Sequence, residues 1–277
     1  MFEIHPITSE DIPEITDLAA ECWHDYFTGA SDSLLEAACG IIHLQRRFNM
    51  NDLILKTREA LLNADAILIG ASNGLSISEG YNIFADNESF NRIFGDLKRK
   101  HGLRSVLDGC FHRYPTEADR REFSDRLVKT WVEDYIPSQV MKDLRKTVGD
   151  KPYFILTTNA DEHLEAAGFS PDRIWEIEGT FRQLREGKEP ENKQAELNAF
   201  LSKYGDSNLV ILELGIGSQN RIIKLPLMQL ALREPNTIYI TLNLPHEIYI
   251  PQEIASKSIA LSGDIAETLR KLTESKL

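Results

Sequence analysis

Short apolar runs recur along the chain, separated by segments with the period of amphipathic helices. The clearest runs lie at 64–69, 153–157, 174–177, 209–214 and 237–242. Near-continuous apolar runs of this length are typical of strands buried on both faces, as in a parallel sheet covered by helices. The alternation predicts a doubly wound, parallel α/β fold of the Rossmann type with right-handed crossovers.

Two segments depart from this alternation. Residues 1–63 have a helical period that begins with capping chemistry at 8–11, so we expect N-terminal helices packed on the core. Residues 85–150 form a charged, mostly helical stretch that is too long for an ordinary crossover. We expect an inserted helical subdomain over a ligand crevice, within a single domain of residues 1–277.

A glycine-rich turn follows the first predicted strand, the run at 64–69, which we expect Gly70 to terminate. Residues 70–76 are Gly-Ala-Ser-Asn-Gly-Leu-Ser, and a further glycine stands at 80. Glycines allow close backbone approach, and free amides at a helix start can hold a pyrophosphate, so this turn is a candidate phosphate cradle. The alternative is a turn that only redirects the chain, because neither the G-x-G-x-x-G nor the P-loop spacing is present.

Polar side chains follow the second predicted strand, where residues 157–161 are Thr-Thr-Asn-Ala-Asp. Ligands of open α/β sheets bind at the carboxyl ends of the strands. Asn159 and Asp161 are therefore candidate site residues, since an amide beside a carboxylate can hydrogen-bond a ribose or orient a water. The alternative is an Asx turn that caps a helix at 162–167.

Later strand ends have the same polar character. Glu178 follows the third run and is a candidate base or ribose acceptor, or else an exposed loop carboxylate. Glu213 lies inside an apolar run and needs a partner, either the amides of the neighbouring turn or a cation such as Arg221. Polar turns also follow at 215–220, at Asn243 and at 262–265.

Composition narrows the choice of partners and location. A net charge of -12 opposes binding to nucleic acids, although local amides can still hold a dinucleotide. Three cysteines without CxxC spacing argue against a disulfide scaffold and a zinc site. No apolar run is long enough to cross a bilayer, and the start lacks the features of a secretion signal, so we expect a cytoplasmic protein without a membrane partner.

The order of these motifs resembles that of sirtuins, the NAD-dependent deacylase and ADP-ribosyltransferase family, over about residues 60–275. The loop at 70–76 resembles the Gly-Ala-Gly-x-Ser NAD loop, and residues 157–161 resemble Thr-Gln-Asn-Ile-Asp. The turn at 215–218 stands where the family has its Gly-Thr-Ser ribose turn. Asn243 matches the asparagine that ends the adenosine-side strand, and residues 263–265 resemble the Gly-Asp-Ala that contacts adenine.

The closest likeness is to the macrodomain-linked, class M branch, found in microbial operons concerned with lipoylated carrier proteins. That branch has a similar Gly-Ala-x-x-Gly-Leu-Ser loop, a motif beginning Thr-Thr-Asn and a strand like Leu-Glu-x-Gly-x-Gly. Glu178 stands where deacylases have the catalytic histidine and class M members a glutamine, the four zinc cysteines are missing, and no arginine follows the NAD loop. These departures speak against deacylation and are compatible with NAD chemistry.

The resemblance implies an NAD-dependent protein ADP-ribosyltransferase that cleaves the nicotinamide–ribose bond and modifies a protein acceptor, such as a lipoylated carrier protein. Asn159 would orient the ribose and any water, Asp161 would bind the carboxamide, and Glu178 would contact the ribose hydroxyls or assist the nucleophile. The alternatives are a non-catalytic NAD or ADP-ribose sensor, an NAD hydrolase and, below these, a protein deacylase. No metal is implied, and the implied cofactor-binding residues are Gly70, Ala71, Gly74, Ser76, Thr158, Gly215, Gly217, Ser218, Asn243 and Asp264.

Overall fold

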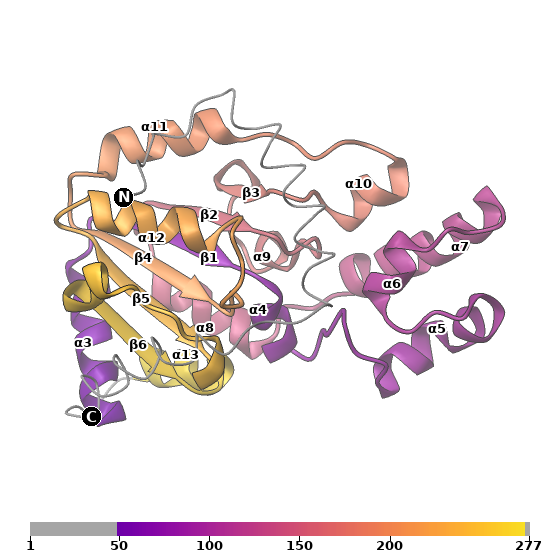
Figure 1. Ribbon diagram of the computed structural model, residues 1–277, viewed down its shortest axis with the longest axis horizontal. Helices are drawn as coiled ribbons and strands as arrows, with labels where there is room; N and C mark the ends of the chain where they lie inside the picture. The colour runs from indigo at the N-terminus through magenta and orange to yellow at the C-terminus, as the bar shows by residue number, and fades with distance from the viewer. Residues whose placement is uncertain (1–48, 275–277) are drawn as a thin grey trace. The chain divides into compact units, whose positions relative to one another are not determined.

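A six-stranded parallel sheet forms the centre of the structure, a computed structural model that describes residues 49–274 (Figure 1). The strand order is β3-β2-β1-β4-β5-β6, and every neighbouring pair is parallel. The predicted doubly wound α/β fold is therefore confirmed. The strands are β1 (Ala66–Ala71), β2 (Tyr153–Thr157), β3 (Ile174–Glu176), β4 (Leu209–Leu214), β5 (Ile238–Asn243) and β6 (Ser258–Ser262).

The strand order reverses direction between β1 and β4, which pair along their whole lengths from Ala66↔Leu209 to Ala71↔Leu214. In open α/β sheets, ligands bind outside the carboxyl ends of the strands at such a switch point. The turns that follow β1 and β4 therefore lie side by side at the place where the fold type binds ligands.

Helices cover both faces of the sheet. On one face, α3 (Met50–Asn63), α8 (Gln139–Val148) and α13 (Ile265–Thr273) share an apolar core with alternate residues of β1, β2, β4 and β5. On the other face, α12 (Lys224–Arg233) packs against β4 and β5, and Phe200 of α11 (Gln194–Tyr204) contacts Phe154 of β2. This double covering explains why the strands are apolar at successive positions.

A second apolar core joins the helices between β1 and α8. It contains Phe90 and Phe94 of α5, Phe123 of α7 and Trp131 of the π-helix η1, together with Phe181 of α10. Helix α8 belongs instead to the main core. The inserted subdomain at 85–150 and its place over a crevice stay predictions. The helices are α4 (Asn73–Ser78), α5 (Glu88–His101), α6 (Val106–Phe111), α7 (Glu117–Leu127), η1 (Val128–Glu133), α9 (His163–Ala166) and α10 (Phe181–Glu186).

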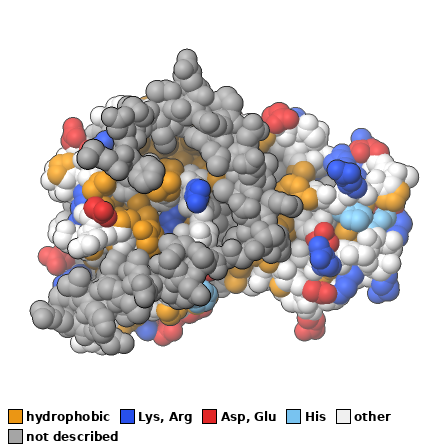
Figure 2. All heavy atoms as spheres, in the orientation of Figure 1, with side chains coloured by type: hydrophobic (Ala, Val, Ile, Leu, Met, Phe, Trp, Pro, Cys, Tyr) orange, Lys and Arg blue, Asp and Glu red, His pale blue; other side chains and the backbone are white. Residues whose placement is uncertain are grey.

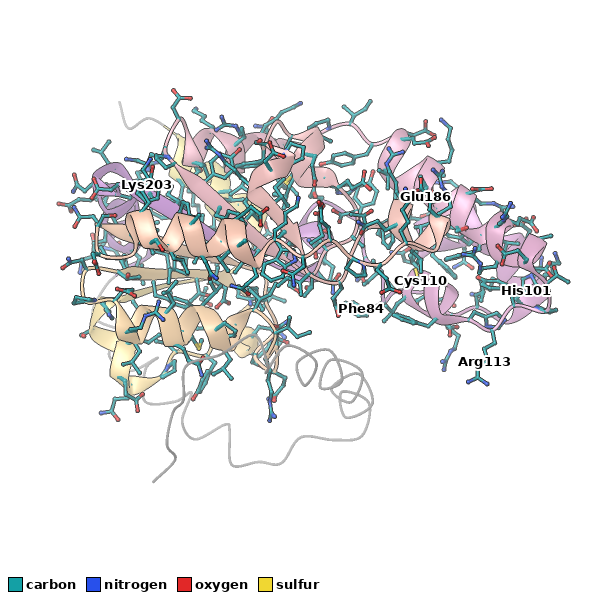
Figure 3. All side chains as sticks on the ribbon, turned by 90° about the horizontal axis from the view of Figure 1, so that it is seen from above. Phe84, His101, Cys110, Arg113, Glu186 and Lys203 are labelled. Carbon is teal, nitrogen blue, oxygen red and sulfur yellow. The ribbon has the colours of Figure 1, made fainter. Side chains whose placement is uncertain are left out.

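The surface of this helical part is charged but not basic. Figure 2 shows Lys, Arg and His side chains among acidic ones in this part, and Figure 3 labels His101 and Arg113 there. Several of the cations are paired, as Lys98 is with Asp86 and Lys100 with Asp119. Such exposed pairs add little stability, and their mixed signs leave no continuous positive surface on these helices.

Two expectations about boundaries differ from the structure. Strand β1 spans Ala66–Ala71, so the run predicted at 64–69 and ended by Gly70 is wrong by two residues, because Ala71 still pairs with Thr157 and Leu214 on either side. Of the helices expected over residues 1–63, the structure describes α3, and residues 1–48 lie outside the described residues. No helix in the described range is both long and apolar enough to span a membrane. Short 3-10 helices complete the fold: η2 (Pro171–Arg173), η3 (Pro245–Glu247) and η4 (Gln252–Lys257).

Candidate functional site

Two glycine turns meet backbone to backbone at the switch point. The amide of Gly74 donates to the carbonyl of Gly215 over 3.0 Å. A Cβ on Gly74 would lie 2.6 Å from the Cα of Gly215, and a Cβ on Gly215, whose φ is +61°, would lie 2.5 Å from the Cα of Gly74. Both glycines are required by this contact itself. Their role in cofactor binding remains a prediction.

Gly70 is explained by packing as well. It lies inside β1, and a Cβ there would come within 2.3 Å of the Leu227 side chain on α12. Gly70 therefore lets the sheet and α12 approach closely, which is a common reason for glycine in a strand.

Three candidate side chains form a hydrogen-bonded chain beside the glycine turns. The Oγ of Ser76 donates to Oδ2 of Asp161 over 2.5 Å, and the Nδ2 of Asn159 lies 2.9 Å from the same Oγ. All three residues are at least 94% buried. The structure thus brings together the motifs that follow β1 and β2, as the sequence predicted.

The donor and acceptor roles along these hydrogen bonds determine the orientation of the Asn159 amide. A carboxylate only accepts, so Ser76 must donate to Asp161 and accept from Asn159. Asn159 therefore presents its NH₂ group to Ser76 and directs its carbonyl Oδ1 elsewhere. That oxygen is buried and has no hydrogen-bond partner among the described residues. Buried polar atoms without a partner are rare, so this oxygen is an acceptor available to a ligand or a water.

A cluster of charged side chains lies next to these three hydrogen-bonded residues. His163, two residues after Asp161, is fully buried, and its Nδ1 lies 3.1 Å from Oε1 of Glu79 and 3.7 Å from Oδ2 of Asp161. Its Nε2 lies 2.8 Å from the carbonyl of Trp131 in η1. Burial acts to lower the pKa of His163, but the hydrogen bond to Glu79 and the charges of Asp161 and Glu79 raise it overall.

Aromatic rings and hydroxyls complete the cluster. Tyr135 stacks on the His163 ring with centroids 3.5 Å apart, and Tyr81 meets the ring edge-on at 4.6 Å. The hydroxyls of Tyr135 and Ser138 both donate to Oε2 of Glu79. This cluster was missed by the sequence analysis, because its partners come from three segments far apart in the chain. The only local signal was the presence of Glu79 and His163 next to the two candidate motifs.

Several carboxylates lie at and near the end of the third strand. Strand β3 ends at Glu176, and Glu178 lies half-buried in the turn that Gly179 closes by donating to the carbonyl of Glu176. Burial, together with a hydrogen bond and the negative charge of Glu176, raises the pKa of Glu165 to about 9. Glu165 and Glu176 thus form a half-buried carboxyl pair on this edge, and the role of Glu178 stays a prediction.

Replacing Glu165 with glutamine is expected to stabilise the protein at alkaline pH. A carboxyl whose pKa is raised on folding contributes stability below its unfolded pKa near 4.5, which is lost as pH rises towards 9. Glutamine cannot ionise, so Glu165→Gln should raise the free energy of unfolding by about 2 kcal/mol at pH 8 and by little at pH 4. Urea unfolding at both pH values checks this, with the exposed Glu196→Gln as control. An equal effect at both pH values would contradict it.

A buried ion pair supports the turn that follows β4. Lys224 Nζ lies 2.7 Å from Oε1 of Glu213, with side-chain exposures of 2% and 0%. Tyr239 and Thr241 also donate to Glu213. The expectation of a cation partner is confirmed, but Arg221 as its example is wrong. Lys224 opens α12 beneath the turn, where its ammonium also reaches the carbonyl of Ile216 over 3.2 Å.

The remaining cofactor candidates lie around the same turn or at its margins. Asn243 donates through Nδ2 to the carbonyl of Ile216, and the amide of Ser218, next to Gly217, donates to Oε2 of Glu247 over 2.7 Å. Thr158 shares a 2.9 Å hydroxyl contact with Ser72. Asp264 is exposed and caps α13 by accepting from Glu267. The cofactor contacts of these residues, Asp264 included, stay predictions.

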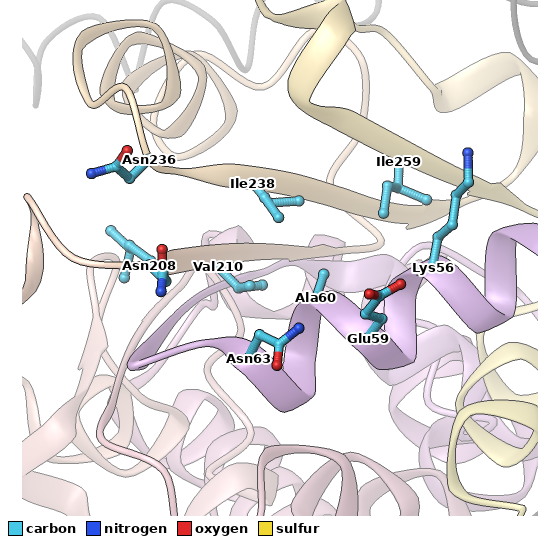
Figure 4. A pocket seen from close by; sticks show the side chains of 10 residues that line it. Lys56, Glu59, Ala60, Asn63, Asn208, Val210, Asn236, Ile238 and Ile259 are labelled. Atoms are coloured by element: carbon cyan, nitrogen blue, oxygen red, sulfur yellow. The ribbon is translucent and has the colours of Figure 1, made fainter.

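A separate cavity lies at the opposite end of the strands. It has a volume of about 360 Å³ and lies between α3 and the amino ends of β4, β5 and β6 (Figure 4). It contains none of the candidate residues, which belong to the carboxyl ends. Within residues 49–274 no group of three or more His, Cys, Asp or Glu side chains could hold a metal ion.

Comparison with known proteins finds similarities in sequence and in structure. The chain is 26% identical to the protein ADP-ribosyltransferase of Staphylococcus aureus (strain Mu50 / ATCC 700699), over 265 aligned residues that cover 76% of this chain and 83% of that protein. A solved structure from work on the structural basis for the mechanism and regulation of Sir2 enzymes covers 80% of this chain and 96% of its own, with 13% identity and a TM-score of 0.49. No protein-family model matches.

The sequence analysis inferred a resemblance to a known family from the order of the motifs along residues 60–275. The macrodomain-linked branch stays a prediction. What the comparison in sequence shows is a similarity of this chain to a protein ADP-ribosyltransferase.

Proposed function

We propose that this protein binds NAD at the carboxyl ends of β1, β2 and β4 and transfers its ADP-ribosyl group to a protein acceptor. The relative named protein ADP-ribosyltransferase and the order of the motifs support the activity. The observation that carries the proposal in this chain is the buried, unpartnered Oδ1 of Asn159. It offers an acceptor for a ribose hydroxyl or for a water at the switch point of the sheet.

The charges around Asn159 suit cleavage of the nicotinamide–ribose bond. That cleavage develops positive charge on the ribose, and fixed negative charge in a buried site stabilises it. Asp161 and Glu79 are carboxylates, and His163 is the one imidazole between them. With His163 protonated, one net negative charge remains in the cluster behind Asn159. Asp161 would bind the carboxamide through lone pairs left over from Ser76 and the His163 amide.

The other assignments follow from the turns at the switch point. Ala71, Ser76 and Thr158 would contact the ligand after β1 and β2, and Gly217, Ser218 and Asn243 would contact it after β4 and β5. Glu178 would contact the ribose hydroxyls or assist the nucleophile. A protein acceptor follows from the proposed activity, and a lipoylated carrier protein and a cytoplasmic location remain part of the proposal.

Calorimetric titration with NAD and with ADP-ribose tests the binding half of the proposal. We expect binding to the wild type, and a loss of about tenfold or more in Asn159→Ala, because one ligand hydrogen bond and the orientation of Ser76 are lost. Asn198→Ala, on the exposed side of α11, is the matched control and should bind as the wild type does. No binding of either ligand at millimolar concentration would overturn the proposal.

The second candidate function is a sensor that binds NAD or ADP-ribose without turnover. It is favoured by one feature, the glutamate at 178 in place of the histidine or glutamine of the related motifs. Tight binding without any release of nicotinamide, in the presence of candidate acceptor proteins, would select the sensor over the transferase.

A further inference from the structure

The His163 side chain occupies a fully enclosed position between three segments of the chain. Glu79 comes from the end of α4, the Trp131 carbonyl and Tyr135 come from η1 and the residues after it, and Asp161 follows β2. The ionisable groups that face the imidazole are Glu79, Asp161, Tyr81 and Tyr135. No group among them is cationic.

The hydrogen bonds around the ring determine its protonation. The Trp131 carbonyl only accepts, so Nε2 must carry a proton and donate to it. Glu79 accepts through Oε2 from the hydroxyls of Tyr135 and Ser138. Its Oε1 faces Nδ1 at 3.1 Å, where a bare nitrogen would oppose a carboxylate oxygen. With Glu79 as a carboxylate, both contacts are satisfied together only when Nδ1 also carries a proton and the ring is an imidazolium.

The charge on His163 affects Asn159 through two intervening side chains, Asp161 and Ser76. An imidazolium would lie 3.7 Å from Oδ2 of Asp161, and Asp161 as a carboxylate can only accept from Ser76. Ser76 then accepts from the Asn159 amide, which holds the Asn159 carbonyl oxygen away from Ser76. With Asp161 protonated, Ser76 could reverse its hydroxyl, and the preference of the Asn159 amide for one orientation would be lost.

We propose that His163 is a positioning residue, which as an imidazolium sets the donor direction along Asp161 and Ser76 and so presents the Asn159 carbonyl oxygen to the ligand. The consequence for turnover rests on the proposed function, whereas the protonation of His163 and the orientation of the Asn159 amide do not. The same contacts join α4 and η1 to the segment after β2, so the ring also aligns the helices of the second core with the candidate site.

A pH dependence follows from this arrangement. The pKa of His163 is raised on folding, so its contribution to stability is complete below the unfolded value near 6.5 and is lost as pH rises through the folded value. The orientation of Asn159 should be lost over the same range. Turnover should accordingly fall on the alkaline side, through kcat more than through KM, because the ligand-binding turns themselves keep their contacts.

NMR of the wild-type protein, labelled at histidine, tests the protonation directly. Among the seven histidines, assigned with the help of His163→Gln, the His163 ring should carry protons on both nitrogens at pH 7.5. In Glu79→Gln the ring should become neutral at a lower pH than in the wild type. A neutral His163 ring in the wild type at pH 7.5 would overturn the inference, whatever the activity of the protein.

The kinetic arm compares nicotinamide release from pH 6 to pH 10 in the wild type, His163→Gln and the control His112→Gln. We expect His163→Gln to lower kcat at least tenfold, with KM raised by less than the tenfold loss of binding expected for Asn159→Ala, and to lose the alkaline fall. The control should keep the wild-type profile. A His163→Gln protein with wild-type kcat and pH profile would overturn the positioning role. No release by the wild type would overturn the proposed function alone, and the NMR arm would still decide the inference.

Discussion

Replacing Lys224 with methionine is expected to lower the free energy of unfolding by about 3–5 kcal/mol. Methionine fills a similar volume but leaves the carboxylate of Glu213 without its cation, 0% exposed and bonded only to hydroxyls. An unpaired buried charge is far more costly than the net benefit of the intact pair. The turn after β4 should loosen as well, because Lys224 also donates to the carbonyl of Ile216. Urea unfolding of Lys224→Met at neutral pH measures the loss.

Two variants separate the buried charge from the lost packing. Lys224→Met combined with Glu213→Gln removes both charges and should recover much of the stability, since glutamine can still bond to Tyr239 and Thr241. Lys271→Met removes a cation from the exposed pair with Glu267 and should change stability little. A single Lys224→Met variant as stable as Lys271→Met would contradict the account of this ion pair.

Replacing Gly215 with alanine is expected to destabilise the protein by about 2–4 kcal/mol and to abolish NAD binding. The residue has a φ of +61°, and the added Cβ would lie 2.5 Å from the backbone of Gly74. Because this neighbour is backbone rather than a flexible side chain, the two turns at the switch point must separate. Thermal unfolding and calorimetric titration with NAD measure the two effects.

Gly187 provides a matched control for the backbone conformation alone. It has a φ of +67°, similar to that of Gly215, but nothing lies within 4 Å of an added Cβ. Gly187→Ala should therefore cost only about 1 kcal/mol and leave NAD binding unchanged. If Gly215→Ala is no more destabilising than Gly187→Ala, the contact between the turns is not the reason for the glycine.

The sheet could be predicted from the sequence because its signal is local. Continuous apolar runs separated by helical periods indicate buried parallel strands, and β2 and β4 have the predicted bounds. The end of β1 was missed by two residues, since small residues such as Gly70 and Ala71 are equally typical of a strand and of a turn. The packing partner of α8 could not be predicted. Its sequence has the same amphipathic period whether the helix packs on the sheet, as it does, or on α5 and α7.

The site could be predicted only as far as topology determines it. Because Asn159 and Ser76 follow neighbouring parallel strands, their meeting follows from the strand order alone. The choice of Lys224 over Arg221 as partner of Glu213 depends on how the intervening turn folds. The cluster of Glu79 and His163 depends on where η1 places the Trp131 carbonyl, which no spacing in the sequence indicates.

The central claim is that the buried amide of Asn159 serves the cleavage of NAD. The most direct test incubates the purified full chain with NAD and follows free nicotinamide, for the wild type, Asn159→Ala and the control Asn198→Ala. The account predicts release by the wild type and the control, and a loss of about 100-fold or more in Asn159→Ala. Release that is unchanged in Asn159→Ala, or no release by the wild type with candidate acceptors present, would contradict it.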